Sequence, residues 1–230
     1  KTSFERYDCG GDLMTKEEEV VFYAKLLDEK GLVNSLEGNI SILDRETGKL
    51  YITPSGKRKS LLTPEMIAVM DGDTQIGGNC KYSSEYLLHQ AALRARPDCN
   101  AAVHTHAPYL TAFAFCNQHV RLRCSTTFGL LFEDIPCLPY GQPGTAAIAA
   151  GIEDAMANRD LVLLANHGCL TVGPTLEAAV AILEAGGEGM KIYSLAKSIG
   201  AVSDIPEEAW ERMCNEHAGS VRNRHKPVNR

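Results

Sequence analysis

The sequence predicts an α/β fold in a single domain. Segments with helical periodicity alternate with short apolar runs of strand character along most of the 230 residues. No internal repeat, linker or low-complexity segment interrupts this alternation. The composition, 44% hydrophobic and 23% charged, is typical of a globular protein with a sizeable core. We therefore expect strands and helices to pack together around one core.

The first predicted elements are a helix and a hairpin. Thr15 and Glu18 form a capping box, which predicts the start of a helix that Gly31 ends. Residues 39–43 and 49–53 are strand-like runs on either side of the turn sequence D-R-E-T-G-K. This arrangement predicts a β-hairpin.

Two helices are predicted next. Residues 62–70 are expected to form a short helix with Pro64 at its first helical position. Residues 85–96 form a second helical pattern, for which Ser83 or Ser84 is the expected cap.

The second half of the chain continues the alternation. Residues 100–106 and 160–168 are apolar runs that predict strands. Helices are expected at 107–115, at 143–157 after a proline, and at 175–199, where the helical pattern persists despite three glycines.

Charge and cysteine content exclude several classes of protein. The net charge of −6 leaves no basic surface for nucleic acid, and we interpret the short cationic clusters at 57–59 and 222–226 as solvated surface. No signal peptide or membrane-length apolar run is present, so we expect a cytoplasmic protein that does not bind membranes. In that compartment the eight cysteines are expected to stay reduced and to behave mostly as small buried hydrophobes.

Three histidines follow apolar strands. His104 and His106 are two residues apart, so on a strand both face the same side, and His167 ends another apolar run. A single H-x-H is a weak signal, because lone histidines are also common in cores and on surfaces. Two such strands in one sheet would nevertheless bring three imidazoles together, which is a recurrent layout for catalytic zinc. The pattern favours a metal site.

Glu85 is a candidate for proton transfer. It stands at the start of the helix that leads into the strand of His104. Taken alone, it is explained by the preference of acidic residues for helix N-termini. Beside a metal ion, the same carboxylate would be able to act as a ligand and as an acid or base.

Three short segments have the character of an anion-binding site. They are G-N-I-S at 38–41, T-P-S-G at 53–56 and S-S at 83–84, all small, polar and rich in backbone donors. Each is also an ordinary turn sequence, and none matches a nucleotide-binding loop. Their combination favours a phosphate pocket.

These motifs together resemble a known family. E-G-N-I-S, I-T-P-S-G, S-S-E-x-x-x-H, V-H-T-H-A, I-P-C-L-P-Y-G-x-P-G-T and A-N-H-G occur in this order. The chain is similar in these motifs to the class II sugar-phosphate aldolases, whose family also includes ribulose-phosphate 4-epimerases and the adducin head domain. The resemblance covers about residues 15–200, which leaves a flexible segment at 1–14 and a C-terminal tail at 201–230.

The resemblance implies a fold, a site and an assembly. The fold is a central, mainly antiparallel sheet between helical layers. The site would hold Zn²⁺, replaceable by Mn²⁺ or Co²⁺, on His104, His106, His167 and Glu85, with Glu85 as catalytic acid and base. The residues implied for the substrate phosphate are Asn39, Ser55, Gly56, Ser83 and Ser84. The implied assembly is a homotetramer with active sites at subunit interfaces.

The resemblance also implies an activity, with alternatives left open. The expected reaction is aldol cleavage of a ketose 1-phosphate, such as L-fuculose 1-phosphate, to dihydroxyacetone phosphate and a short aldehyde. A metal ion would stabilise the enediolate that forms as the bond breaks. Family aldolases carry a tyrosine near the position of Ser125 that protonates the aldehyde oxygen. Its absence keeps a decarboxylase, dehydratase or 4-epimerase as alternatives, and a non-catalytic adducin-like scaffold as another.

Overall fold

A computed structural model describes residues 14–224, with side chains up to residue 216. It confirms the predicted α/β fold. Eight strands form one sheet in the order β4-β3-β2-β1-β5-β8-β7-β6, and every pair is antiparallel except β6 with β7. The strands are β1 Asn39–Leu43, β2 Leu50–Ile52, β3 Ala68–Asp71, β4 Thr74–Gly77, β5 Ala101–Thr105, β6 Cys137–Leu138, β7 Leu161–Leu164 and β8 Gly168–Gly173.

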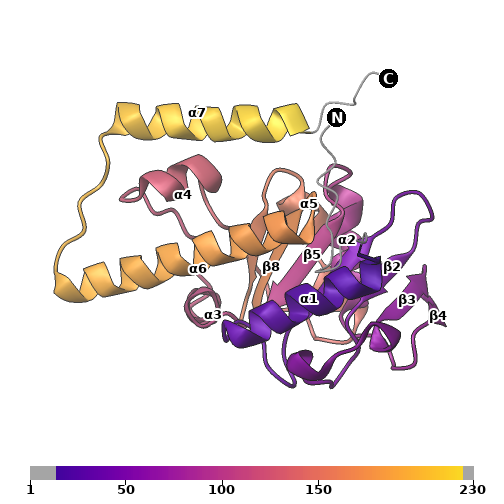
Figure 1. The fold of residues 1–230 in the computed structure, drawn as a ribbon. Coiled ribbons are helices and arrows are strands. Elements are labelled where there is room, and N and C mark those ends of the chain that lie inside the picture. The colour runs from indigo at the N-terminus through magenta and orange to yellow at the C-terminus, as the bar shows by residue number, and fades with distance from the viewer. Residues whose placement is uncertain (1–13, 225–230) are drawn as a thin grey trace.

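Helices cover both faces of the sheet (Figure 1). The α-helices are α1 Lys16–Glu29, α2 Tyr86–Ala95, α3 Pro108–Phe115, α4 Thr126–Leu131, α5 Ile152–Met156, α6 Leu176–Ile199 and α7 Glu207–Arg224. Three short 3₁₀ helices are η1 Lys59–Leu61, η2 Pro64–Met66 and η3 Ala146–Ala149.

The strand pleat divides the core between the two faces. In β5, Val103 packs into the core beneath α1, α3 and α6, whereas Ala102 packs into the core beneath α2 and α5. Leu163 and Leu164 in β7 alternate in the same way. Central strands buried on both faces must be apolar at every position, which is why their sequences form unbroken hydrophobic runs.

The predicted start of α1 is confirmed at atomic level. The Thr15 hydroxyl accepts from the Glu18 amide at 3.2 Å, and the Glu18 carboxylate accepts from the Thr15 amide at 2.7 Å. Two backbone donors that the first helical turn leaves unpaired are thereby satisfied. The helix ends before Gly31, which adopts a positive φ of 68°.

Two predicted helices are wrong in extent. At 62–70 a single 3₁₀ turn from Pro64 is followed by strand β3, in which Ala68 and Met70 face the core while Val69 is only partly buried. This alternation suits a strand, and pairing with β2 decides the outcome. At 143–157 the helix is broken by Gly151, whose φ of 75° separates η3 from α5.

The C-terminal region contains α7, which lies against α4 (Figure 1). Trp210 is fully buried there. A Cβ added to Gly129 would lie 3.0 Å from the edge of the Trp210 ring, so the glycine makes room for this ring. None of the helices in the described part of the chain combines the length and the apolar character that a bilayer crossing requires. The segment predicted to be flexible, 1–14, lies outside the described residues except for Met14.

Candidate metal centre and active site

Sheet pairing brings the three histidines to one edge. His104 lies near the end of β5 and His106 directly after it, while His167 lies in the turn between β7 and β8. Because β5 pairs with β8 through Thr105 and Cys169, that turn meets the end of β5. The ring centroids are 4.7 to 5.1 Å apart, and one nitrogen from each ring lies within 4.8 Å of the others.

The turn that carries His167 depends on two unusual backbone positions. Asn166 has a φ of 56°, in the left-handed region that asparagine tolerates better than most residues. At Gly168 an added Cβ would lie 2.5 Å from the Thr105 carbonyl oxygen and 2.8 Å from the His106 ring. The N-H-G sequence therefore permits the close approach of the two strands that sets the histidine spacing.

His104 has the properties of a prepared metal ligand. Its side chain is fully buried, and its Nδ1 lies 2.8 Å from the Cys169 carbonyl oxygen. Since a carbonyl only accepts, Nδ1 carries the proton and Nε2 presents a lone pair. Burial lowers the pKa of His104 to about 4, which keeps the ring neutral. Nε2 has no hydrogen-bond partner among the described residues, so this buried nitrogen fits a metal ion.

His106 is oriented by a carboxylate. Its Nδ1 lies 3.2 Å from an oxygen of Glu37, which leaves Nε2 as the nitrogen that could ligate a metal ion. Burial is the main cause that lowers the pKa of His106. Glu37 itself is held by the Asn34 side chain, and that hydrogen bond lowers the pKa of the Glu37 carboxyl. Burial thus favours a neutral His106 imidazole, and the Asn34 hydrogen bond favours an anionic Glu37 carboxylate.

Glu85 faces the histidine cluster. Its carboxylate oxygens lie 3.2 Å from His167 Nε2 and 3.4 Å from His104 Nε2. Burial alone would raise the pKa of Glu85, but the hydrogen bonds from His167 and Asn39 hold it well below the usual range. The group is therefore a carboxylate, and together with the three imidazoles it forms a donor set that suits a divalent cation.

The local structure at Glu85 differs from the prediction. Glu85 is itself the N-cap of α2, without a capping side-chain bond, and Ser83 accepts from the Glu85 amide at 3.3 Å. Neither Ser83 nor Ser84 is the helix cap. Because the Glu85 side chain makes no capping hydrogen bond, its carboxylate can turn toward the histidines.

A buried chain of hydrogen bonds through Asn39, His89 and Ser41 holds the Glu85 carboxylate in place. Asn39 donates its amide to Glu85 at 2.6 Å, so the Asn39 oxygen must be the acceptor for His89 Nε2. His89 Nδ1 then accepts from the Ser41 hydroxyl at 2.7 Å. Burial lowers the pKa of His89 to about 3, consistent with this neutral tautomer.

Sequence reasoning placed His89 on a helix but assigned it no role in the site. Its signal is the spacing from Glu85: residues four apart share one helix face. The chain from Ser41 to Glu85 shows that this face of α2 is buried against β1.

All five residues predicted for phosphate line one cavity of about 180 Å³ beside the histidines. They are Asn39, Ser55, Gly56, Ser83 and Ser84. Glu37, Glu85, His106 and His167 line the same space. The cavity therefore places the small polar segments directly next to the candidate metal ligands.

Lys59 also lines this cavity, and here the sequence interpretation was wrong. Lys57 and Arg58 are exposed as expected for a surface cluster, but Lys59 is only 2% exposed. The turn at Gly56, with a φ of 64°, carries the chain back so that η1 packs against α1.

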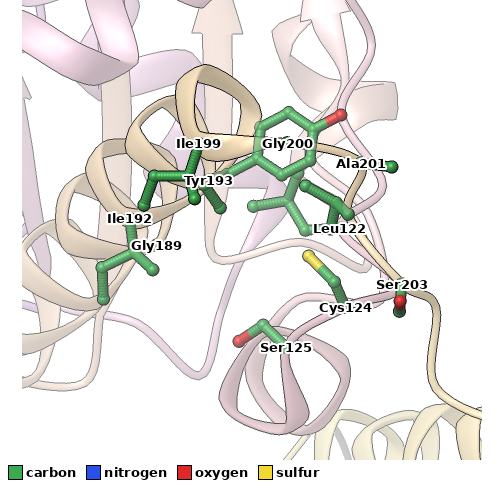
Figure 2. Close-up of a pocket in the computed structure, with 12 residues that line it drawn as sticks. Leu122, Cys124, Ser125, Gly189, Ile192, Tyr193, Ile199, Gly200, Ala201 and Ser203 are labelled. Carbon is green, nitrogen blue, oxygen red and sulfur yellow. The ribbon is translucent and has the colours of Figure 1, made fainter.

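Ser125 lies in a different pocket. It is the N-cap of α4 and, with Leu122, Cys124, Tyr193 and Ile199, lines a mainly apolar hollow of about 400 Å³ beside the C-terminal part of α6 (Figure 2). None of the histidines or Glu85 lines this hollow. Within one subunit, Ser125 is therefore not part of the histidine cavity.

Comparisons with known proteins agree with this architecture. The family model described as Class II Aldolase and Adducin N-terminal domain matches residues 18–194. A 5-deoxy-D-ribulose 1-phosphate aldolase of Bacillus thuringiensis serovar kurstaki is 34% identical over 90% of this chain and 97% of its own length. A solved structure of L-fuculose 1-phosphate aldolase has a TM-score of 0.81 and 32% identity, over 87% of this chain and 95% of that one. A 3-oxo-tetronate 4-phosphate decarboxylase of Escherichia coli is 31% identical over 82% of this chain and 88% of its own length.

Proposed function

The chain belongs to the class II aldolase and adducin family, and from this membership we propose that it is a metal-dependent aldolase for a ketose 1-phosphate. The products would be dihydroxyacetone phosphate and a short aldehyde. The observation that carries the proposal is the position of Glu85, which lies between two histidines of the cluster and the polar cavity. Because enzymes named for 5-deoxyribulose and fuculose phosphates are among the proteins similar to this chain, these two substrates are the first to assay.

The metal would be held by His104, His106 and His167, with Glu85 as a further ligand before substrate binds. Zn²⁺ suits three nitrogen ligands, and Mn²⁺ or Co²⁺ would substitute for it. When bound, the ion would supply a Lewis acid that stabilises negative charge on the ketone oxygen. The buried, unpartnered Nε2 of His104 supports this assignment.

Glu85 would exchange the proton at the carbon beside the carbonyl. In the cleavage direction this carbon gains a proton as the carbon–carbon bond breaks, and in the condensation direction it loses one. Asn39 holds the carboxylate in place through its amide donor. The backbone and hydroxyl groups of Ser55, Gly56, Ser83 and Ser84 would bind the phosphate and so orient the reacting bond.

A decarboxylase is the second candidate. It is supported by the similarity to the 3-oxo-tetronate 4-phosphate decarboxylase and by the lack of a tyrosine near Ser125, where the family resemblance implies one for an aldolase. A decarboxylation needs charge stabilisation beside a carbonyl but no group to protonate an aldehyde oxygen. The adducin-like scaffold is disfavoured, since all three histidines and Glu85 are present.

A substrate panel separates these activities. The metal-loaded protein would be incubated with 5-deoxyribulose 1-phosphate, fuculose 1-phosphate and a 3-oxo-tetronate 4-phosphate, followed by measurement of dihydroxyacetone phosphate and carbon dioxide. We expect dihydroxyacetone phosphate from a ketose 1-phosphate. Decarboxylation of the 3-oxo-tetronate 4-phosphate also leaves dihydroxyacetone phosphate, so carbon dioxide released from that substrate, with no dihydroxyacetone phosphate from either ketose 1-phosphate, would establish the second candidate. No turnover of any substrate would refute both.

We also propose that the protein is a homotetramer with active sites at subunit interfaces, as the family resemblance implies. The exposed apolar side chains Ile192, Leu195 and Ile199 on α6 supply a surface that a neighbouring subunit would cover. Size-exclusion chromatography with light scattering would then give a mass four times the chain mass of 25.0 kDa. A monomer would contradict it.

A further inference from the structure

Lys59 is a buried cation in the wall of the candidate site. Its side chain is 2% exposed, and it lines the cavity together with Ser55, Ser83 and Glu85. Burying an ammonium without a close partner is costly, so such groups mark sites where a ligand completes the pairing.

The described residues give Lys59 no such partner. None of their carboxylates lies within the 4.0 Å of an ion pair, although Asp28, Glu85 and Glu37 are near enough to favour its charged form. Burial is the dominant effect and lowers the pKa of the Lys59 ammonium. An anion in the cavity would reverse this penalty.

The charge balance of the cavity points the same way. Glu37 and Glu85 are both carboxylates, and among the described residues that line the cavity Lys59 is the one lysine or arginine. Serine hydroxyls and backbone amides are neutral. Without Lys59, a doubly charged phosphate would enter next to two carboxylates with only the metal ion to offset them.

We infer that Lys59 binds the phosphate of the substrate, as the cationic member of the pocket formed by Ser55, Gly56, Ser83 and Ser84. The inference rests on the proposed function for the nature of the substrate, but not for the presence of a phosphate site. Lys59 would make a charge-assisted hydrogen bond to a phosphate oxygen, and selectivity for phosphorylated over free sugars would come largely from this group.

Binding of inorganic phosphate to the metal-loaded protein tests the inference without requiring turnover. Lys59→Met keeps the aliphatic stem of the side chain and removes the charge. We expect it to weaken phosphate binding about 10- to 100-fold, the loss typical of a hydrogen bond to a charged group. Lys59→Arg should retain most of the affinity. The matched control is Lys57→Met, two residues away and exposed, which should bind phosphate like the wild type.

A substrate cleaved by the wild type adds a second readout. Lys59→Met should raise KM by a similar factor with a smaller change in kcat, and inhibition by inorganic phosphate should weaken in parallel. If Lys59 only balances the nearby carboxylates, the variant will lose thermal stability while its phosphate affinity stays within twofold of the wild type. That result would overturn the inference.

Should Lys59→Met fail to fold, the wild-type protein still decides the question. A crystal structure of the metal-loaded enzyme with inorganic phosphate should place Lys59 Nζ about 2.8 Å from a phosphate oxygen. Phosphate bound in the cavity away from Lys59 would refute the assignment. Absence of turnover on every sugar phosphate, with phosphate binding that depends on Lys59, would instead refute only the proposed reaction.

Discussion

At the scale of single residues, the site is built from side chains whose proton positions are determined by their neighbours. The Cys169 carbonyl fixes the tautomer of His104, and Glu37 orients His106. Asn39 and His89 fix Glu85 from the opposite side. The candidate ligand nitrogens and the carboxylate therefore face one point, and this arrangement reduces the cost of organising the site.

Glu85 provides the first prediction. Glu85→Gln keeps the size of the side chain and an oxygen that can accept the hydrogen bond from Asn39, but glutamine cannot exchange a proton. We expect kcat to fall about 10²- to 10⁴-fold, the usual contribution of a positioned acid or base. Steady-state kinetics on the metal-loaded variant would measure this. Wild-type turnover by Glu85→Gln would exclude Glu85 as the acid and base.

His89 provides a prediction about pH. Its pKa is about 3 in the folded protein and near 6.5 in an unfolded chain, so below pH 6.5 the unfolded state binds an additional proton. His89 therefore lowers the stability as the pH falls through this range, by up to about 1.4 kcal/mol per pH unit. His89→Gln removes this dependence.

We expect the free energy of unfolding of His89→Gln at pH 7 to be about 1–3 kcal/mol lower than that of the wild type, because two buried hydrogen bonds are lost. This difference in stability should be smaller at pH 5, because only the wild type loses stability through His89 as the pH falls. Urea unfolding of the metal-free proteins at both pH values measures it, since metal binding has its own pH dependence. An identical difference at pH 5 and pH 7 would contradict the buried neutral histidine.

At the scale of secondary structure, the contact between the end of β5 and the β7–β8 turn sets the histidine spacing. The sequence predicted part of this arrangement, because apolar runs that end in H-T-H and N-H-G indicate strands followed by candidate ligands. Which strands are neighbours is a long-range property, and β5 pairs with β8 across more than sixty positions, as in the bond between His104 and Cys169. Periodicity within a short segment does not contain that information.

Gly168 provides a prediction at this scale. Gly168→Ala would place a Cβ 2.5 Å from the Thr105 carbonyl oxygen and force the strands apart. We expect a loss of about 2–4 kcal/mol in the free energy of unfolding, together with weaker metal binding. Denaturant unfolding and metal titration would measure the two effects.

The matched control is Gly187→Ala in α6, where no atom lies within 4 Å of the added Cβ. Alanine there should be neutral or stabilise by up to about 1 kcal/mol, because glycine is a poor helix former. If the two alanine variants had equal stability, the close approach at Gly168 would not control the turn.

At the scale of the whole molecule, the order of the motifs along the chain predicted the fold and the composition of the candidate site. His104, His106, His167 and Glu85 lie together as that order implied. Lys59 and His89 were not predicted as parts of the site, because a lysine in a K-R-K cluster and a histidine within a helix look the same whether buried or exposed. Their burial depends on η1 packing against α1 and on α2 packing against β1.

Metal content per subunit tests the account most directly. Elemental mass spectrometry on protein purified without chelator should find about one Zn²⁺ per chain. His104→Ala should lose it, whereas His119→Ala, which changes an exposed histidine paired with Asp134, should keep it. Finding no metal even after dialysis against zinc, or unchanged metal content in His104→Ala, would contradict the three-histidine site and the chemistry derived from it.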